Sequence, residues 1–377
     1  MRGYPNWHDG NSVELLIDGE RFFPAMLEAI ERARESVLIE LYLAASGRVM
    51  NEFIAALSDA AARGVSVHLM LDHFGARELR PIDRETLRRA GIHLALYNPI
   101  AFSKLFSNFS RDHRKLMVID GRVAFIGGAG LTDRFRIGRA NQPDTPWHEL
   151  MCRIEGPVVD DMFELFARQW HRTCLECMPP PATTQLHRTV DGGASVRVLT
   201  AEGPQSQQIK FSILHMTRRS RHRVWICTAY FLPSFALRLA LRRAARRGID
   251  VRLLVSGPLT DHRWIYHASK RYYRRLLKAG VRIYEYQPRM LHAKIALIDD
   301  QVSLGSCNLD HWNLRWNLEA NIEVREPRFA HDVERLILTD LDQSQEITAA
   351  EWARRPWHRK IRELVWAMIS QWILRIR

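Results

Sequence analysis

Two short segments of the chain each place a histidine and a lysine where both side chains could act on one group. The first segment reads HRKLMVID and begins at His113, and the second reads HAKIALID and begins at His292. Residues two apart in a strand point to the same side, so His113 projects with Lys115, and His292 with Lys294. Histidine can act as nucleophile or general acid near neutral pH, and lysine supplies positive charge for phosphate oxygens. Each segment therefore offers an imidazole and an ammonium group to one phosphate.

An aspartate ends each segment. Asp120 and Asp299 follow their histidines by seven residues, an odd separation that turns their side chains to the other side of a strand. We count both among the catalytic residues of the motif, and we expect their side chains to face away from the substrate and to stabilise the motif. One copy of the motif would be weak, because an exposed basic strand end has the same pattern. Two copies can meet at one phosphodiester, where one histidine forms a phosphohistidine and the other handles the protons of the two alcohols.

The elements around the two motifs are also repeated. In each copy a helix ends at a glycine and an apolar strand follows, in the same order along the chain. The repeats predict an α/β fold of two tandem homologous halves packed about a pseudo-twofold axis, each half a mostly parallel sheet flanked by helices. The matching blocks are Val37–Leu43 with Val224–Tyr230, Ala61–Leu71 with Ala245–Val255, and Arg89–Pro99 with Lys278–Pro288.

Four segments follow from these repeats. The first half spans 1–177, a proline-rich linker 178–194, the second half 195–345, and a basic C-terminal segment 346–377. Within the last, Trp357–Arg377 has apolar residues at helical spacing, with tryptophan and basic residues, which indicates a helix lying in a membrane surface. The alternative is a terminal helix docked on the protein's own core.

The first half has an insertion between its third strand and its motif that the second half lacks. It spans Ile100–Asp112, whereas the second half has only Arg289–Leu291 at that place. One interpretation is a loop packed on the core, and the other is an apolar lip that touches acyl chains. Its apolar side chains are Phe102, Leu105, Phe106 and Phe109.

The composition of the chain limits the class of protein, but its charge does not identify the binding partner. With 55 Lys+Arg against 42 Asp+Glu the formal net charge is +13, which attracts nucleic acid, an anionic membrane or phosphate-bearing substrates. The polar first ten residues and the lack of an apolar run of ~20 residues predict neither secretion nor a membrane span. Five cysteines indicate a reducing compartment, and the CxxC at Cys174 and Cys177 lacks the second pair that a zinc site needs. We expect no metal and no cofactor.

The doubled pattern HxKxxxxD, followed by Gly127-Gly128 in one copy and Gly305-Ser306 in the other, resembles the signature of the phospholipase D superfamily. The resemblance extends from about Val13 to Glu326. Within the superfamily, four stretches are most similar to bacterial cardiolipin synthases of the short peripheral type, which lack N-terminal transmembrane helices. These stretches are Val13–Ile30, Arg153–Val159, Tyr272–Lys294 and Asn308–Ile322.

The resemblance implies roles for further residues. Glu149 and Glu319 match the carboxylates that orient the two histidines, a role that fixes the tautomer and stabilises the imidazolium. Asn308, with Gly128 and Ser306, matches the turn that supports the site. The first half has Gly130 where the second has Asn308, so the two turns differ. The resemblance also implies that His113 is the nucleophile and His292 the general acid and base.

The implied activity is phosphatidyl transfer between two phosphatidylglycerol molecules, giving cardiolipin and glycerol, by a peripheral protein on the cytoplasmic side of a bacterial inner membrane. Phosphatidylethanolamine stays open as the donor. The alternative is a phospholipase D-type hydrolase or a nuclease, which would also explain the positive charge. A nuclease would not explain the apolar insertion or the C-terminal helix, so nucleic acid is not the expected partner. The two complete His/Lys pairs argue against a non-catalytic lipid-binding module.

Overall fold

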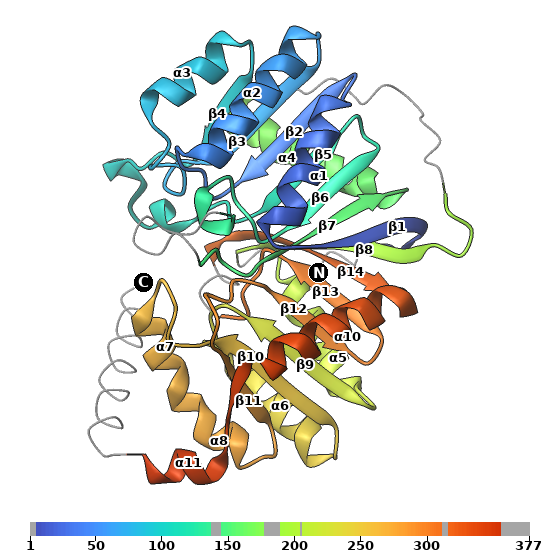
Figure 1. Cartoon of the computed structure of the whole chain (residues 1–377), viewed down its shortest axis with the longest axis vertical. Helices are drawn as coiled ribbons and strands as arrows, with labels where there is room; N and C mark the ends of the chain where they lie inside the picture. Colours follow the sequence, from blue (N-terminus) through green and yellow to red (C-terminus); the bar gives the residue numbers. More distant parts are fainter. Residues whose placement is uncertain (1–4, 137–144, 177–188, 204–205, 311–315, 356–377) are drawn as a thin grey trace.

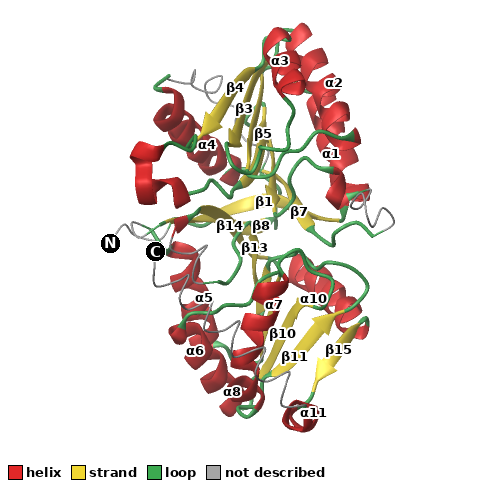
Figure 2. Ribbon diagram, turned by 90° about the vertical axis from the view of Figure 1, so that its left-hand side faces the viewer, coloured by secondary structure: helices red, strands yellow, loops and turns green. Residues whose placement is uncertain are grey.

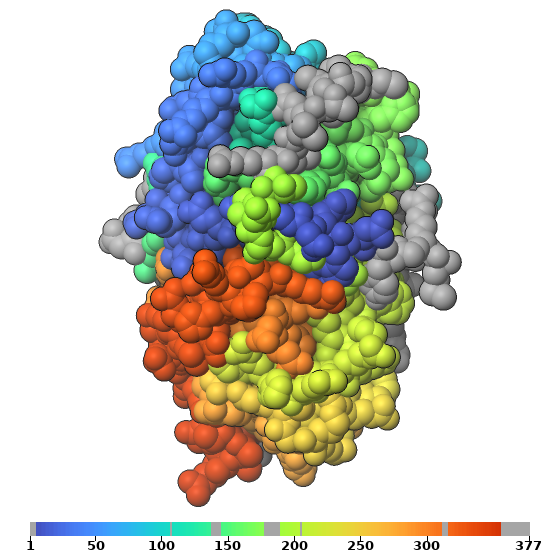
Figure 3. All heavy atoms as spheres, turned by 90° about the vertical axis from the view of Figure 1, so that its right-hand side faces the viewer, coloured from blue at the N-terminus to red at the C-terminus, as the bar shows by residue number. Residues whose placement is uncertain are grey.

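A computed structural model of the 377-residue chain describes residues 5–136, 145–176, 189–203, 206–310 and 316–355. Its strands form one 15-stranded sheet in the order β15-β11-β10-β9-β12-β13-β14-β8-β1-β7-β6-β5-β2-β3-β4. The two lobes of the molecule meet where β1 and β8 pair (Figure 1). Figure 3 shows the same junction on the surface, with the blue β1 segment beside the yellow-green β8 segment above the orange α10.

The first lobe holds the N-terminal copy of the repeat. Its elements are β1 (His8–Ile17), α1 (Gly19–Glu31), β2 (Ser36–Leu41), α2 (Arg48–Ala62), β3 (Ser66–Asp72), α3 (Pro81–Arg89), β4 (His93–Tyr97), η1 (Phe102–Phe109), β5 (Lys115–Ile119), β6 (Val123–Gly127), η2 (Asp133–Phe135), β7 (Leu150–Glu155) and α4 (Val158–Cys174).

The second lobe repeats this order. Its elements are β8 (Ala194–Glu202), α5 (Gln208–Arg219), β9 (Arg223–Thr228), α6 (Phe235–Arg246), β10 (Asp250–Ser256), α7 (Arg263–Ser269), η3 (Lys270–Tyr272), α8 (Tyr273–Leu277), β11 (Arg282–Tyr286), β12 (Ile295–Ile298), β13 (Gln301–Gly305), β14 (Leu318–Arg325), α10 (Pro327–Asp342), β15 (Ser344–Ile347) and α11 (Ala349–Arg354).

Helices cover both faces of the sheet in each lobe (Figure 2). Strands covered in this way need apolar residues throughout, and β2 and β3 are buried at every position after the first. The glycines predicted to end the preceding helices do so: Gly64 and Gly248 have φ angles of 89° and 85°, which side chains disfavour. One apolar core runs through both lobes, because Phe166 of α4 and Val333 of α10 belong to the same cluster.

The predicted fold class and the tandem halves are confirmed, and the strand directions need a correction. Parallel pairing is confined to β2-β3-β4 and β9-β10-β11. The motif strands β5 and β12 form hairpins with β6 and β13. Each hairpin also pairs antiparallel with the strand on either side, β2 and β7 in the first half and β9 and β14 in the second. Connections of a few residues between these strands are too short for a parallel crossover. Each half is therefore a mixed sheet, not a mostly parallel one.

Several sequence predictions fall on residues outside the described ranges. The C-terminal helix at 357–377, most of the linker and Cys177 are among them, and the segment boundaries stay predictions. Within the described ranges, no helix is long and apolar enough to cross a membrane. The same ranges contain no group of His, Cys, Asp and Glu side chains that could hold a metal ion.

Candidate active site

The two motif segments are held at the junction by backbone bonds to the opposite half. The His113 N–H donates to the Leu318 carbonyl at 2.9 Å, and the His292 N–H donates to the His148 carbonyl at 2.7 Å. Each acceptor residue directly precedes a glutamate: Leu318 comes before Glu319, and His148 before Glu149. Each histidine therefore sits beside the other half's β-segment, and the pairing of β1 with β8 keeps the halves in this register.

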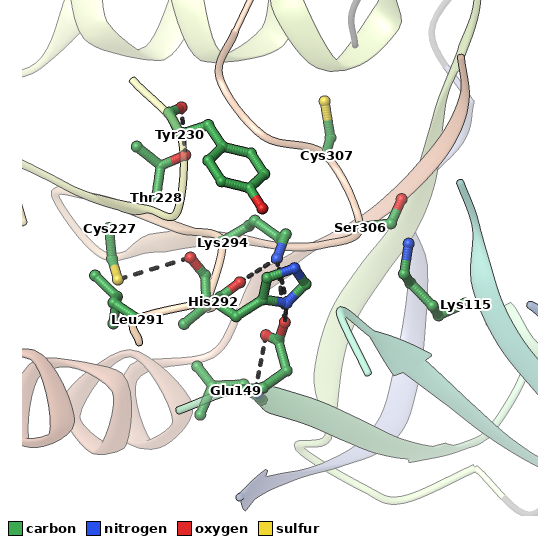
Figure 4. Close-up of polar contacts among 12 residues, drawn as sticks. Lys115, Glu149, Cys227, Thr228, Tyr230, Leu291, His292, Lys294, Ser306 and Cys307 are labelled. Carbon is green, nitrogen blue, oxygen red and sulfur yellow. Dashed lines mark hydrogen bonds and ion pairs between the residues drawn. The ribbon is translucent and has the colours of Figure 1, made fainter. Parts of the chain in front are cut away.

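The two predicted carboxylates reach the histidines in a crossed arrangement. Nδ1 of His113 lies 3.0 Å from a carboxylate oxygen of Glu319, which belongs to the second half. Nδ1 of His292 contacts Oε2 of Glu149, which belongs to the first half (Figure 4). Because Nδ1 of each ring is held by a carboxylate, Nε2 is the nitrogen left for chemistry.

The lysines pack against the histidines of their own segments. The Nζ of Lys115 donates to the His113 carbonyl at 2.5 Å. The Nζ of Lys294 lies 2.8 Å from Nδ1 of His292 and 3.1 Å from Oε2 of Glu149. Both lysines are almost fully buried, at 1% and 3% exposure. Two ammonium groups thus stand beside two imidazoles, as the paired motifs predict.

One cavity of about 720 Å³ receives both histidines. Lys115 and Gly128 also line it, together with Arg134 and Asp261. Much of the remaining wall is apolar and suits a hydrocarbon rather than a polar chain. Those apolar residues are Leu43, Phe74, Ile100, Phe109, Phe135, Trp147, Leu232, Trp264 and Ile265.

Burial keeps both imidazoles neutral. Burial and the charge of Lys294 lower the pKa of His292 to about 4, against the opposing effect of Glu149. Burial and the charge of Lys115 hold the pKa of His113 well below its usual value. An anionic phosphodiester in the cavity would favour the charged imidazolium and so raise these pKa values. Substrate binding can therefore load a proton onto the histidine that acts as the acid.

The pKa values of the two glutamates shift in opposite directions although their geometry is similar. Burial raises the pKa of Glu319 to about 8, against the lowering effect of Lys115. Burial also opposes ionisation of Glu149, but the charge of Lys294 outweighs it and keeps the pKa of Glu149 below its usual value. Burial lowers the pKa of Lys115 to about 7, against the raising effect of Glu319.

The two aspartates of the motif lie at the far end of their strands. Asp120 accepts hydrogen bonds from three successive backbone N–H groups, those of Arg34, Glu35 and Ser36, at 2.8–2.9 Å. Asp299 accepts them from the backbone N–H groups of Arg221, His222 and Arg223 at 2.9–3.3 Å. Neither aspartate lines the cavity. Both aspartates lie away from the cavity, as the sequence predicts, but in turns just past β5 and β12 with φ angles of 52° and 50°, not on the opposite face of the strand. There they tie β2 and β9 to the motif strands and are not among groups that could touch a substrate.

The turns after the motifs accommodate the glutamates differently. A Cβ atom on Gly128 would clash with the carboxylate of Glu149, so a side chain there would displace that carboxylate. Ser306, at the equivalent place, instead donates its hydroxyl to Glu319. Asn308 is fully buried beside this turn, and within the described residues its side-chain amide has no hydrogen-bond partner.

Sequence reasoning missed a buried charge network that adjoins Glu149. His148 is hydrogen-bonded to Asp18 at Nδ1 (2.8 Å) and to Asp340 at Nε2 (3.1 Å). Arg289 also contacts Asp18. Although burial opposes it, the bonds to both aspartates raise the pKa of His148 to about 9. The position of His148 directly before Glu149 was the available signal. The network joins the two halves and holds the backbone that His292 contacts.

Ring contacts around the histidines were also missed. The Tyr42 ring lies 4.7 Å from the His113 ring, and the Trp147 ring 5.1 Å from the His292 ring. Tyr230 stands edge-on to His292 at 6.5 Å. Tyr42 and Tyr230 both belong to the repeated blocks at the ends of β2 and β9, which was the signal that could have found them.

Known proteins match both the sequence and this architecture. The family model described as "Cardiolipin synthase, PLD-like domain" matches residues 26–170 and 213–341. Cardiolipin synthase A of Pseudomonas putida is 36% identical over 343 residues, covering 90% of this chain and 70% of that protein. The Pseudomonas fluorescens protein of the same name is 34% identical over 345 residues, with coverage of 90% and 71%.

Solved structures share the fold at low sequence identity. The phosphatidylserine synthase of Haemophilus influenzae superposes with a TM-score of 0.69 at 15% identity, covering 89% of this chain and 87% of that one. The polyphosphate kinase of Porphyromonas gingivalis has a TM-score of 0.61 at 15% identity, covering 90% and 49%. The family model matches both halves of the chain, and the curated relatives match across them. The chain therefore belongs to the cardiolipin synthase family of proteins with phospholipase D-like domains.

Proposed function

We propose that the protein transfers a phosphatidyl group between two phosphatidylglycerol molecules, forming cardiolipin and releasing glycerol. The observation that carries the proposal is the convergence of His113 and His292 on one cavity, each anchored through Nδ1 by a glutamate of the opposite half. Lys115 and Lys294 supply the positive charge that a phosphodiester and its transition state require. The curated relatives carry the name of this activity.

The proposed reaction has two balanced steps. Nε2 of His113 attacks phosphorus, the bond to the headgroup oxygen breaks, and His292 gives that oxygen its proton, so free glycerol leaves. A second phosphatidylglycerol then presents a headgroup hydroxyl, whose proton passes to His292 as its oxygen bonds to phosphorus and the P–N bond breaks. Glu149 stabilises His292 while it is protonated, and Glu319 does so for the phosphorylated His113 ring.

We further propose that the protein works on the surface of an anionic membrane, on its cytoplasmic side. Beside the cavity, the insertion exposes Ile100, Phe102 and Leu105 by 55%, 103% and 72%. Phe74, at 40% exposure, lies under the Arg77 guanidinium at 4.5 Å, and both line the cavity. Apolar side chains beside a basic group fit an anionic headgroup layer, and the net charge of +13 favours the anionic cytoplasmic leaflet.

A product assay tests the proposal. Purified protein is incubated with phosphatidylglycerol labelled in its acyl chains, in mixed micelles, and the lipid products are separated. Cardiolipin with an equal amount of glycerol is the expected result. Phosphatidic acid as the sole product would instead identify a hydrolase, the alternative that the same site supports, because water can attack the phosphohistidine in place of a lipid alcohol.

A further inference from the structure

The two halves line the cavity with different chemistry at equivalent positions. Strands β2 and β9 are equivalent, because Val37 pairs with Ile119 of β5 as Val224 pairs with Ile298 of β12. Six residues beyond these valines lie Leu43 and Tyr230, and both line the cavity. An apolar side chain in the first half thus corresponds to a phenol in the second.

The loops after the neighbouring strands differ in charge. Strands β3 and β10 are equivalent, because each pairs in parallel with the strand just compared. Five residues past their ends, at Asp72 and Ser256, lie Arg77 and Asp261, and both line the cavity. At these positions the first half presents Arg77 and Leu43, and the second half presents Asp261 and Tyr230. The first half also has a carboxylate at Glu78, but that group is paired with Arg134 at 2.7 Å.

Tyr230 and Asp261 form a joined pair on the His292 side of the cavity. The Tyr230 hydroxyl donates to both carboxylate oxygens of Asp261, at 2.7 and 2.9 Å. The Asp261 side chain is 16% exposed, so part of it faces the cavity. Figure 4 shows the Tyr230 ring beside Lys294, with its hydroxyl directed to the region of His292.

A carboxylate is an unfavourable neighbour for an anionic phosphodiester, because like charges repel. It suits a ligand group that carries hydrogen-bond donors and no negative charge. The leaving and attacking groups of the proposed reaction are such groups, since both are glycerol hydroxyls. An ammonium group would also donate, but Lys294 and Lys115 stand close by and repel a cationic headgroup.

We propose that Tyr230 and Asp261 form the subsite that binds the hydroxyl groups of the glycerol headgroup beside His292. The inference rests on the proposed function and deepens it, because it names the part of the cavity that selects the alcohol. The carboxylate accepts a hydrogen bond from the free hydroxyl of the headgroup that does not react, and the reacting hydroxyl lies against His292. That hydroxyl oxygen bonds to phosphorus as the P–N bond to His113 breaks, and its proton passes to His292.

Competition between acceptors tests the subsite. Short-chain phosphatidylglycerol is supplied as donor, with labelled glycerol, ethanol and water as acceptors, and the products are labelled phosphatidylglycerol, phosphatidylethanol and phosphatidic acid. All three arise from the same covalent intermediate, so their ratios are independent of how much enzyme is folded or how fast the intermediate forms. Ethanol has a single hydroxyl and cannot use a subsite for additional ones.

In Asp261→Asn and Tyr230→Phe we expect the ratio of glycerol transfer to hydrolysis to fall about ten- to hundredfold, the effect of losing hydrogen bonds to a charged group. The ratio of ethanol transfer to hydrolysis should stay unchanged. The control Asp300→Asn removes a carboxylate whose side chain is 82% exposed and lies outside the cavity, and both ratios should match those of the unaltered protein.

Contrary results separate the subsite from the proposed function. Unchanged glycerol ratios in both variants, or an equal fall for ethanol, overturn the subsite while transfer itself stands. In a second competition, ethanolamine is added as a further acceptor, and its transfer gives phosphatidylethanolamine. A preference for ethanolamine over glycerol by the unaltered protein assigns the pair to an ammonium group and likewise overturns the inference. An unaltered protein that transfers to no alcohol at all overturns both the proposed function and the subsite.

Discussion

Glu149, in the first half of the chain, contacts Nδ1 of His292 in the second half, and Glu319 returns the contact to His113. The crossing follows from the backbone bonds that seat each motif beside the other half's glutamate strand. Neither half therefore contains a complete histidine–carboxylate pair. Both pairs are formed across the junction where β1 pairs with β8.

Filling the space at Gly128 should disable the crossed pair without altering either partner. In Gly128→Ala the new Cβ would clash with the Glu149 carboxylate, so the carboxylate must leave Nδ1 of His292. We expect turnover to fall at least about a hundredfold, close to the loss in Glu149→Gln, because the imidazole loses its orienting group. Steady-state rates and thermal unfolding check this. Ser306→Gly, the matched change in the other half, removes one bond to Glu319 and should cost less.

Each histidine should be indispensable. His113→Ala and His292→Ala should each lower turnover by about a thousandfold or more, because each step needs both a phosphorus acceptor and a proton donor. The double variant should be no worse than either single one, since the two groups act as a unit. Rate measurements on the three variants check this. Near-normal turnover in a single variant would show that the histidines do not share one site.

The intermediate should be trapped on a histidine. When turnover of labelled phosphatidylglycerol is quenched, alkaline conditions should preserve the protein-bound label and acid should release it, since phosphohistidine is acid-labile. Peptide mapping should place the label on the peptide containing His113, the nucleophile that the family resemblance implies. A label on His292 would reverse the two roles, and a label on serine or lysine would contradict the mechanism.

The His148 network should make stability depend on pH. Bonds to Asp18 and Asp340 raise the pKa of His148 to about 9, above its unfolded value near 6.5. A raised pKa means that the stabilisation is complete below about pH 6.5 and is lost as pH rises through 9. The loss amounts to about 3 kcal/mol for this buried group, so urea midpoints should fall over that range. His148→Gln should flatten this part of the profile; an unchanged profile would show that the network is not charged.

The apolar residues of the insertion should govern membrane binding. Replacing Phe102 and Leu105 together by serine removes two exposed apolar side chains and should weaken binding to anionic vesicles while leaving activity on short-chain lipid intact. Vesicle sedimentation and the product assay check both. Phe211→Ser is the control, because Phe211 is 53% exposed on α5 and lies outside the cavity wall. Equal vesicle binding by the double variant and the unaltered protein would place the membrane contact elsewhere, with 357–377 the next segment to delete.

Local sequence patterns predicted the direction of the motif side chains and the presence of two α/β halves. The spacing of His113 and Lys115 has the period of a strand, so their shared direction needed no tertiary information. Asp120 lies away from the cavity as predicted, but in a turn past the end of β5 with a φ angle of 52°, where the period of the strand no longer applies. The repeated blocks predicted two α/β halves, because each block contains its own helix end, glycine and buried strand.

Only the tertiary structure decided how the halves combine. The crossed contacts of Glu149 and Glu319, the His148 network and the pairing of Tyr230 with Asp261 all join residues far apart in sequence. The tertiary structure also decided the strand directions. β5 and β6 pair antiparallel because a short connection joins them, and such a connection cannot form a parallel crossover. A repeat shows that two halves exist, but the packing of one against the other decides which carboxylate meets which histidine.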